Sequence, residues 1–306
     1  MLSMVCIPFL QHPALAEKED STGNLWPQRI VVFPLYAEEI LYGLVEPERI
    51  VYVGHEYNEA GIGYWPTMAD CREASGSGWE NSSEEEILSL NPDLLIFGDP
   101  TLQVDYAEVF PSFAKAKIPT IFLDSPQSID EIANLILLLG NAVQKQEEAL
   151  CMVEEMRSSM AAVRELAEKV PENEIKTVAL YGEHSPFFDI AAKACGINGV
   201  YCGDKKALLD TAPDAIIIEP YCVDVGYILG IGKAYSVECI AGLKTDPCLS
   251  QLAAVSSNNI FVIYFSGSQY ISDCTLRLFE AVYPELVKTE GSSWRGVPSR
   301  KKFFDF

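Results

Sequence analysis

Two adjacent carboxylates follow the first strongly apolar stretch of the chain, in the sequence RIVVFPLYAEEIL of residues 29–41. Paired acids can serve general acid–base catalysis when one carboxyl is protonated and the other is ionised. Glu38 and Glu39, however, fall where a helix is expected to start, and the first turn of a helix favours negative charge. We therefore assign them to the helix start. Pro34 fixes φ and directs the chain outward, so Tyr36 is the predicted ligand contact of this stretch.

Aromatic and imidazole side chains recur in the segments that follow predicted strands. Flat rings provide a large contact area at a small entropy cost, which suits a broad and partly apolar ligand. Two such histidines are few for a site that binds bare zinc or manganese, and the alternative is that both are ordinary loop residues. The candidate ligand-binding residues are Tyr36, His55, Tyr57, Tyr64, Trp65, Trp79, Tyr181, His184, Tyr221, Tyr264 and Tyr270.

The familiar sequence signatures of catalysis are missing. The glycines of GYILGIGK, residues 226–233, have the wrong spacing for a phosphate loop, and no G-x-S-x-G or G-x-G-x-x-G motif is present.

The nine cysteines form no C-x-x-C pair, although a disulfide between Cys195 and Cys202 is an open alternative. We expect a protein that is not an enzyme and holds no cofactor. The alternative is a metallocluster or chelatase-type enzyme with Cys71, Cys202 and Cys222 as ligands.

Composition narrows the possible partners and location. Forty-four acidic residues against 22 basic ones give a net charge of −22, which disfavours nucleic acid and anionic lipid. No apolar run approaches the roughly 20 residues of a spanning helix. Residues 1–16 end in Ala-Leu-Ala before a charged run, which fits the end of a signal peptide without its basic region. We expect an exported monomer, periplasmic or associated with the cell surface. A lipid anchor on Cys6 is the less favoured alternative.

Short apolar runs bounded by turn residues alternate with helical patterns along most of the chain. Because these runs are apolar throughout, they predict parallel sheets that are covered on both faces. Residues 145–170 carry apolar side chains at spacings of three and four and contain no Gly or Pro, so they predict one amphipathic helix roughly 39 Å long. The predicted strands are 29–35, 49–55, 93–99, 119–124, 177–181, 214–218 and 259–264.

An internal similarity suggests that the chain contains two related halves. EEILSLNPDLLIFGDP ends at Pro100, and KKALLDTAPDAIIIEP ends at Pro220. In both segments a helical pattern leads into Pro-Asp and then a strand. The predicted fold class is α/β, with two Rossmann-like lobes and parallel sheets joined by one long rigid helix. The predicted divisions are a signal remnant at 1–16, lobes at 24–144 and 175–287, the helix at 145–170, and a tail at 288–306.

Several of these segments together resemble one family. RIVVFPLYAEEILYGL, PERIVYVGHE, EEEILSLNPDLLIFGD and IPTIFLDSPQSIDEIANLILLLGNAV precede the long helix, and DPCLSQLAAVSSNNIFVIYFSGSQY follows it. The series resembles the substrate-binding proteins of ABC importers for iron complexes, haem and cobalamin, over about residues 28–287. The resemblance implies a ligand held between two lobes with little hinge closure, and an ABC permease with its ATPase as partners.

The resemblance also implies that one acidic residue on each lobe docks onto the permease. Glu85, seven residues before Pro92, matches this position in the first lobe. The alternative is that the glutamates there only stabilise the N-terminus of a helix, where negative charge complements the helix dipole. In the second lobe the equivalent residue is Lys206, so Asp204 is the candidate substitute and symmetric docking is in question.

Few basic residues lie near the predicted loops, and this allows the candidate ligands to be ranked by how much they need cationic partners. Arg72 and Lys233 are the nearest cations, whereas haem propionates and anionic siderophores favour Arg partners. We therefore favour a corrinoid, followed by haem and then a ferric siderophore. If haem is the ligand, His55, His184 or a tyrosine of the cleft is expected to coordinate its iron.

Overall fold

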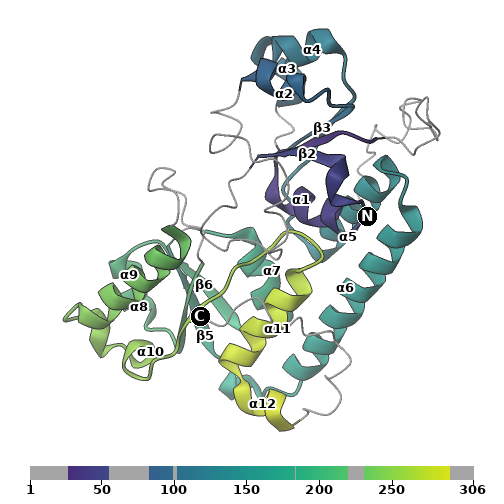
Figure 1. Ribbon diagram of the computed structural model, residues 1–306. Coiled ribbons are helices and arrows are strands. Elements are labelled where there is room, and N and C mark those ends of the chain that lie inside the picture. Colours follow the sequence, from purple (N-terminus) through teal and green to yellow (C-terminus); the bar gives the residue numbers. More distant parts are fainter. Residues whose placement is uncertain (1–26, 55–82, 99–101, 183, 220–230, 290–306) are drawn as a thin grey trace.

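The computed structural model describes residues 27–54, 83–98, 102–182, 184–219 and 231–289. These residues form two lobes, each built on a four-stranded parallel sheet (Figure 1). The strand orders are β2-β1-β3-β4 and β6-β5-β7-β8, so the second sheet repeats the first. The predicted α/β fold, with two Rossmann-like lobes joined by a long helix, is confirmed.

The first lobe places nearly continuous apolar strands between helices. Its two central strands, β1 and β3, are fully buried, as expected for a parallel sheet covered on both faces. Its elements are β1 (Ile30–Val32), α1 (Leu35–Tyr42), β2 (Ile50–Val53), α2 (Glu84–Ser89), β3 (Leu94–Phe97), α3 (Leu102–Val109), α4 (Pro111–Ala116), β4 (Thr120–Phe122) and α5 (Ile129–Ala142).

The second lobe contains a strand that the sequence pattern did not predict. This strand, β6, is an edge strand with an Asn-Gly start and little burial, so it lacks an apolar run. The elements of the lobe are β5 (Thr177–Tyr181), α7 (Pro186–Ala194), β6 (Asn198–Cys202), α8 (Lys205–Thr211), β7 (Ala215–Ile218), α9 (Ile231–Thr245), α10 (Ala253–Ser256), β8 (Ile260–Val262), α11 (Ile271–Val282) and α12 (Pro284–Thr289).

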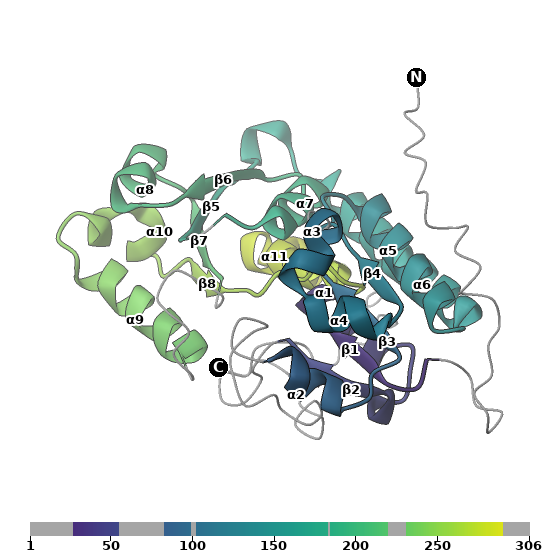
Figure 2. The ribbon, with the colours of Figure 1, turned by 90° about the horizontal axis from the view of Figure 1, so that it is seen from above.

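The joining helix is α6 (Gln146–Ala167), which lies within the predicted range 145–170. It packs against α5 of the first lobe and α11 of the second (Figure 2). Leu150, which was predicted to lie on its apolar stripe, is 51% exposed. Ala149 is buried instead, because the close approach of Gly140 on α5 leaves room there only for a small side chain. None of the described helices is both long and apolar enough to cross a lipid bilayer.

The internal similarity extends to the hydrogen bonds that start each sheet. The carboxylate of Asp93 accepts the Arg29 N–H at 2.8 Å, and that of Asp214 accepts the Thr177 N–H at 2.8 Å. The helices before them are also capped equivalently, α2 by Ser83 and α8 by Asp204. The two halves therefore share local chemistry as well as topology.

Candidate ligand-binding cleft

The carboxyl ends of the two sheets approach one another across the lobe boundary. All strands within each sheet are parallel, so their carboxyl ends lie along one edge, where α/β proteins usually bind ligands. Helix α1 follows β1, and residues 263–270 follow β8. Figures 1 and 2 both show α1 beside the chain between β8 and α11. The region around this contact is the candidate cleft.

Tyr36 lies at the carboxyl edge of the first sheet, in the first turn of α1. Its ring is half-buried against the main hydrophobic cluster, and a Cβ on Gly98, just beyond β3, would be 3.5 Å from its hydroxyl. Burial raises the pKa of Tyr36 well above its ordinary value, and the negative charge of Asp124 raises it further. The buried hydroxyl has no hydrogen-bond partner among the described residues. The Tyr36 side chain is therefore a neutral phenol rather than a phenolate.

The other described tyrosines of the predicted set pack mainly into hydrophobic clusters. Tyr181 packs against the smaller cluster of the second lobe, and burial raises its pKa. Tyr264 is half-buried against the main cluster. Tyr270, at the start of α11, is only 9% exposed, because its ring is part of the main core.

His184 forms a small exposed cluster just after β5. Its Nε2 lies 2.8 Å from Asp189 Oδ2, and its ring packs edge-on against Tyr201 with 5.5 Å between ring centroids. Neither partner of His184 was predicted from the sequence. Tyr201 lies on β6, which was not predicted, and Asp189 lies in the first turn of α7. The remaining predicted ligand residues lie outside the described part of the chain: His55, Tyr57, Tyr64, Trp65, Trp79 and Tyr221.

The cysteines do not form the bridge that the sequence left open. Cys195 and Cys202 are free and buried, with Cys195 Sγ near the Thr275 carbonyl and Cys202 Sγ near the Thr211 hydroxyl. Of the other two cysteines proposed as cluster ligands, Cys71 and Cys222, neither belongs to the described residues. Among the described residues, no group of three or more His, Cys, Asp or Glu side chains is placed to hold a metal ion.

The adjacent carboxylates of α1 are buried, which corrects their assignment as simple helix-start residues. Glu38 is in the first turn as predicted, but both Glu38 and Glu39 are 0% exposed. Glu38 Oε1 accepts the Gly54 N–H at 3.1 Å, which ties α1 to the end of β2. Burial raises the pKa of Glu38 well above 4.5, against the effect of the Gly54 hydrogen bond. This carboxyl is therefore predominantly neutral near its ordinary pKa.

Glu39 connects the two lobes directly. The hydroxyls of Ser266 and Ser268, both fully buried in the chain after β8, lie within hydrogen-bond distance of Glu39 Oε2, the second at 2.7 Å. Gln269 Nε2 also donates to the Glu39 backbone carbonyl at 3.0 Å. The partners are 227 to 230 positions apart in sequence, so no local pattern could have identified them. We call Glu39, Ser266, Ser268 and Gln269 the interlobe joint.

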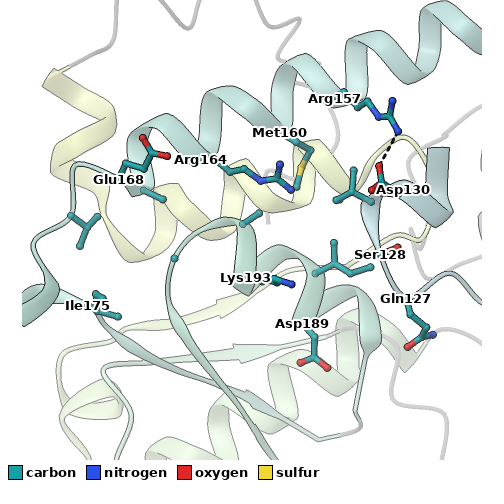
Figure 3. A pocket seen from close by; sticks show the side chains of 16 residues that line it. Gln127, Ser128, Asp130, Arg157, Met160, Arg164, Glu168, Ile175, Asp189 and Lys193 are labelled. Atoms are coloured by element: carbon teal, nitrogen blue, oxygen red, sulfur yellow. Dashed lines mark hydrogen bonds and ion pairs between the residues drawn. The ribbon is translucent and has the colours of Figure 1, made fainter. Parts of the chain in front are cut away.

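A groove lies between α6, α7 and the start of α5. Its volume is about 820 Å³, and Figure 3 shows Arg164 and Met160 on one wall and Lys193 on another. Arg157 and Asp130 form an ion pair at 2.9 Å near one end. None of the predicted ligand residues that the structure describes lines this groove. It is therefore distinct from the aromatic cleft that the sequence predicted.

The two predicted docking residues have different local roles. Glu85 is exposed in the first turn of α2, whereas its neighbour Glu84 accepts the Ser112 and Phe113 N–H groups that open α4. Asp204 caps α8 by accepting the Ala207 N–H at 2.7 Å. Its counterpart in the first lobe is therefore the cap Ser83 rather than Glu85.

Comparison with known proteins agrees with this architecture. The chain belongs to the periplasmic binding protein family, whose sequence profile matches residues 39–201. A curated relative, the uncharacterized ABC transporter substrate-binding lipoprotein YvrC of Bacillus subtilis (strain 168), is 26% identical over 175 residues. That match covers 57% of this chain and 52% of YvrC, so the chain spans about half the length of this relative.

Solved structures share the fold at low sequence identity. The molybdate periplasmic binding protein MolA of Haemophilus influenzae superposes with a TM-score of 0.65 at 15% identity, covering 89% of this chain and 93% of MolA. The periplasmic heme-binding protein RhuT from Roseiflexus sp. RS-1 gives 0.64 at 20% identity, covering 85% and 99%. These similarities show a common two-lobe fold.

Proposed function

We propose that this chain is the extracytoplasmic binding protein of an ABC importer and carries a metal chelate between its two lobes. The observation that carries the proposal is the meeting of two parallel-sheet edges at the candidate cleft, with the neutral Tyr36 phenol beside it. The family membership and the substrate-binding relative support it. In this role the protein has no catalytic step, and a permease with its ATPase receives the ligand.

The charges at the strand ends favour a ligand with little net negative charge. Among the described residues that follow the strands, at 33–38, 54, 98, 123–128, 182, 184–185, 203–204, 219 and 263–270, none is Lys or Arg, whereas Glu38, Asp124, Asp204 and Glu219 are acidic. An anionic siderophore or the propionates of haem would lack cationic partners there. We therefore place a corrinoid first, haem second and a ferric siderophore third.

A binding panel tests this order. The purified chain is titrated with cyanocobalamin, cobinamide, hemin and several ferric siderophores by calorimetry, and by quenching of its four tryptophans. We expect a corrinoid Kd below about 10 μM, which corresponds to more than about 7 kcal/mol of binding free energy. Preferential binding of hemin or a siderophore would reverse the order. Failure of every chelate to bind at that level would contradict the proposed cargo class.

A further inference from the structure

Three buried oxygen atoms from the two lobes lie within hydrogen-bond distance of one another in the interlobe joint. Glu39 Oε2 contacts the hydroxyls of Ser266 and Ser268, and these two hydroxyl oxygens are 2.6 Å apart. All three residues are 0% exposed. The contacts close a ring of three oxygens in which one atom comes from the first lobe and two come from the second.

The number of available protons decides how this ring can be satisfied. Each serine hydroxyl has one proton to donate, and each already accepts a backbone N–H, from Ser268 at 3.0 Å and Tyr270 at 3.3 Å. With Glu39 ionised, two protons serve three oxygen–oxygen contacts, so one contact has no proton between its atoms. With Glu39 protonated, every contact has one proton, and every oxygen in the ring both donates and accepts.

We propose that Glu39 holds a proton while the lobes are joined, which makes the interlobe joint a pH-sensitive latch. Glu39 is then a positioning residue, because it fixes the first lobe to the segment that leads into α11 without itself needing to touch the ligand. The latch is a property of the free protein. Its effect on cargo binding rests on the proposed function.

The surroundings of the ring also disfavour a buried negative charge. The charged residues of α1 are Glu38 and Glu39, and Glu219 follows β7. The segment 263–270 carries none, and α11 carries Asp273, Arg277 and Glu280, with Arg277 further along the helix than Asp273. Strand β1 carries no charged residue, and the charged side chains of α5 and α6 are exposed to solvent. Ionising Glu39 would therefore place a negative charge in a buried region among other acids, which is costly.

The proposal fixes the direction of the pH effect. When the lobes separate, Glu39 meets water and releases its proton at any pH above the ordinary value for a glutamate, about 4.3. Because opening then releases one proton, raising the pH favours the open form by up to tenfold per unit until Glu39 ionises in the joined form as well. The latch is strongest in mildly acidic solution, and the cleft loosens as the pH rises.

Amide hydrogen exchange of the free protein tests the latch directly. Exchange in a peptide covering residues 263–271 is measured from pH 6 to 9 and corrected for the intrinsic pH dependence of amide exchange. We expect the corrected rate to rise by up to tenfold per unit in wild type, and to stay nearly constant in Glu39→Gln. The side-chain amide of that variant does not titrate in this range, so its hydrogen bonds to the serines are the same at every pH. A flat profile in wild type, or the same rise in Glu39→Gln, would overturn the proposal.

Glu38→Gln is the matched control, because it also neutralises a buried carboxyl of α1 but keeps the ring intact. We expect it to retain the rise at 263–271. Infrared difference spectra provide a second measurement, because they detect the protonated carboxyl of Glu39 directly. This measurement does not rely on how stable the variant is during hydrogen exchange. Wild type at pH 6 should show protonated-carboxyl absorption that is partly lost in Glu39→Gln. Absorption unchanged by that substitution would mean that Glu39 is ionised, and the proposal would fail.

Ligand binding forms a separate arm of the test. We expect the affinity for cyanocobalamin to fall between pH 6 and 9 in wild type and to change less in Glu39→Gln. If cyanocobalamin does not bind but the corrected exchange rate rises with pH, the cargo assignment is wrong and the latch stands. If cyanocobalamin binds with no step in exchange, the latch is wrong and the cargo assignment stands.

Discussion

At the scale of single residues, Tyr36 is the described side chain that we predict to contact the ligand. Its hydroxyl is buried without a partner among the described residues, so a ligand acceptor there would restore a hydrogen bond at little cost. We expect Tyr36→Phe to weaken corrinoid binding by about 1 kcal/mol, measured by calorimetry, while the free energy of unfolding changes by less than that. Tyr283→Phe, at the carboxyl end of α11, is the control. Equal loss of affinity in both variants would argue against a specific role for Tyr36.

Glu38 predicts a pH dependence of folding stability. Burial raises the pKa of Glu38 in the folded protein. The contribution of Glu38 to the free energy of unfolding is therefore complete below its ordinary pKa of 4.5, and it declines as the pH rises toward the pKa of the folded protein. We expect Glu38→Gln to reduce the loss of stability between pH 5 and 8, as measured by urea denaturation at each pH. Glu85→Gln, which changes an exposed glutamate, should leave the loss unchanged. An unaltered pH profile in Glu38→Gln would show that this carboxyl ionises normally.

At the scale of elements, α5 and α6 approach each other closely at Gly140. A Cβ on Gly140 would lie 2.3 Å from the Ala149 Cβ, whereas a Cβ on Gly242 in α9 would meet nothing within 4 Å. Alanine usually stabilises a helix interior by roughly 0.5–1 kcal/mol over glycine. We expect Gly242→Ala to show that gain, and Gly140→Ala to lose about 1–3 kcal/mol through overpacking. Urea denaturation of both variants measures the contrast, and a gain at Gly140 would mean that the two helices can separate freely.

The same elements show what local sequence patterns can and cannot predict. The central strands and α6 were predicted because continuous apolar runs and three-to-four spacing depend only on neighbouring residues. Strand β6 was missed because an exposed edge strand needs no apolar run. The predicted strand at 29–35 extended too far, because α1 already begins at Leu35. The burial of Glu39 depends on serines more than 200 residues away, and only the assembled lobes reveal it.

At the scale of the whole molecule, the equivalent surfaces of the two lobes differ in charge. The first turn of α2 carries three glutamates, while α8 begins with Lys205 and Lys206. Glu85 and Lys206 occupy equivalent positions, and both are exposed. Lys206 is paired with Asp210, but such exposed ion pairs contribute little and leave the lysine accessible. If both helices face the permease, its two subunits must therefore present surfaces of different charge.

This asymmetry leads to a prediction about docking. In binding assays with the cognate permease in nanodiscs, we expect Glu85→Lys and Lys206→Glu each to weaken association by about tenfold at low salt, with a smaller effect at high salt. Neither change should alter ligand affinity, because both side chains lie on outer helices. Glu155→Lys, on the exposed face of α6, is the control for net charge. Tighter association of Lys206→Glu would instead mean that both lobes dock through acidic residues, because a lysine that faces an acidic permease surface can only lose affinity when its charge is reversed.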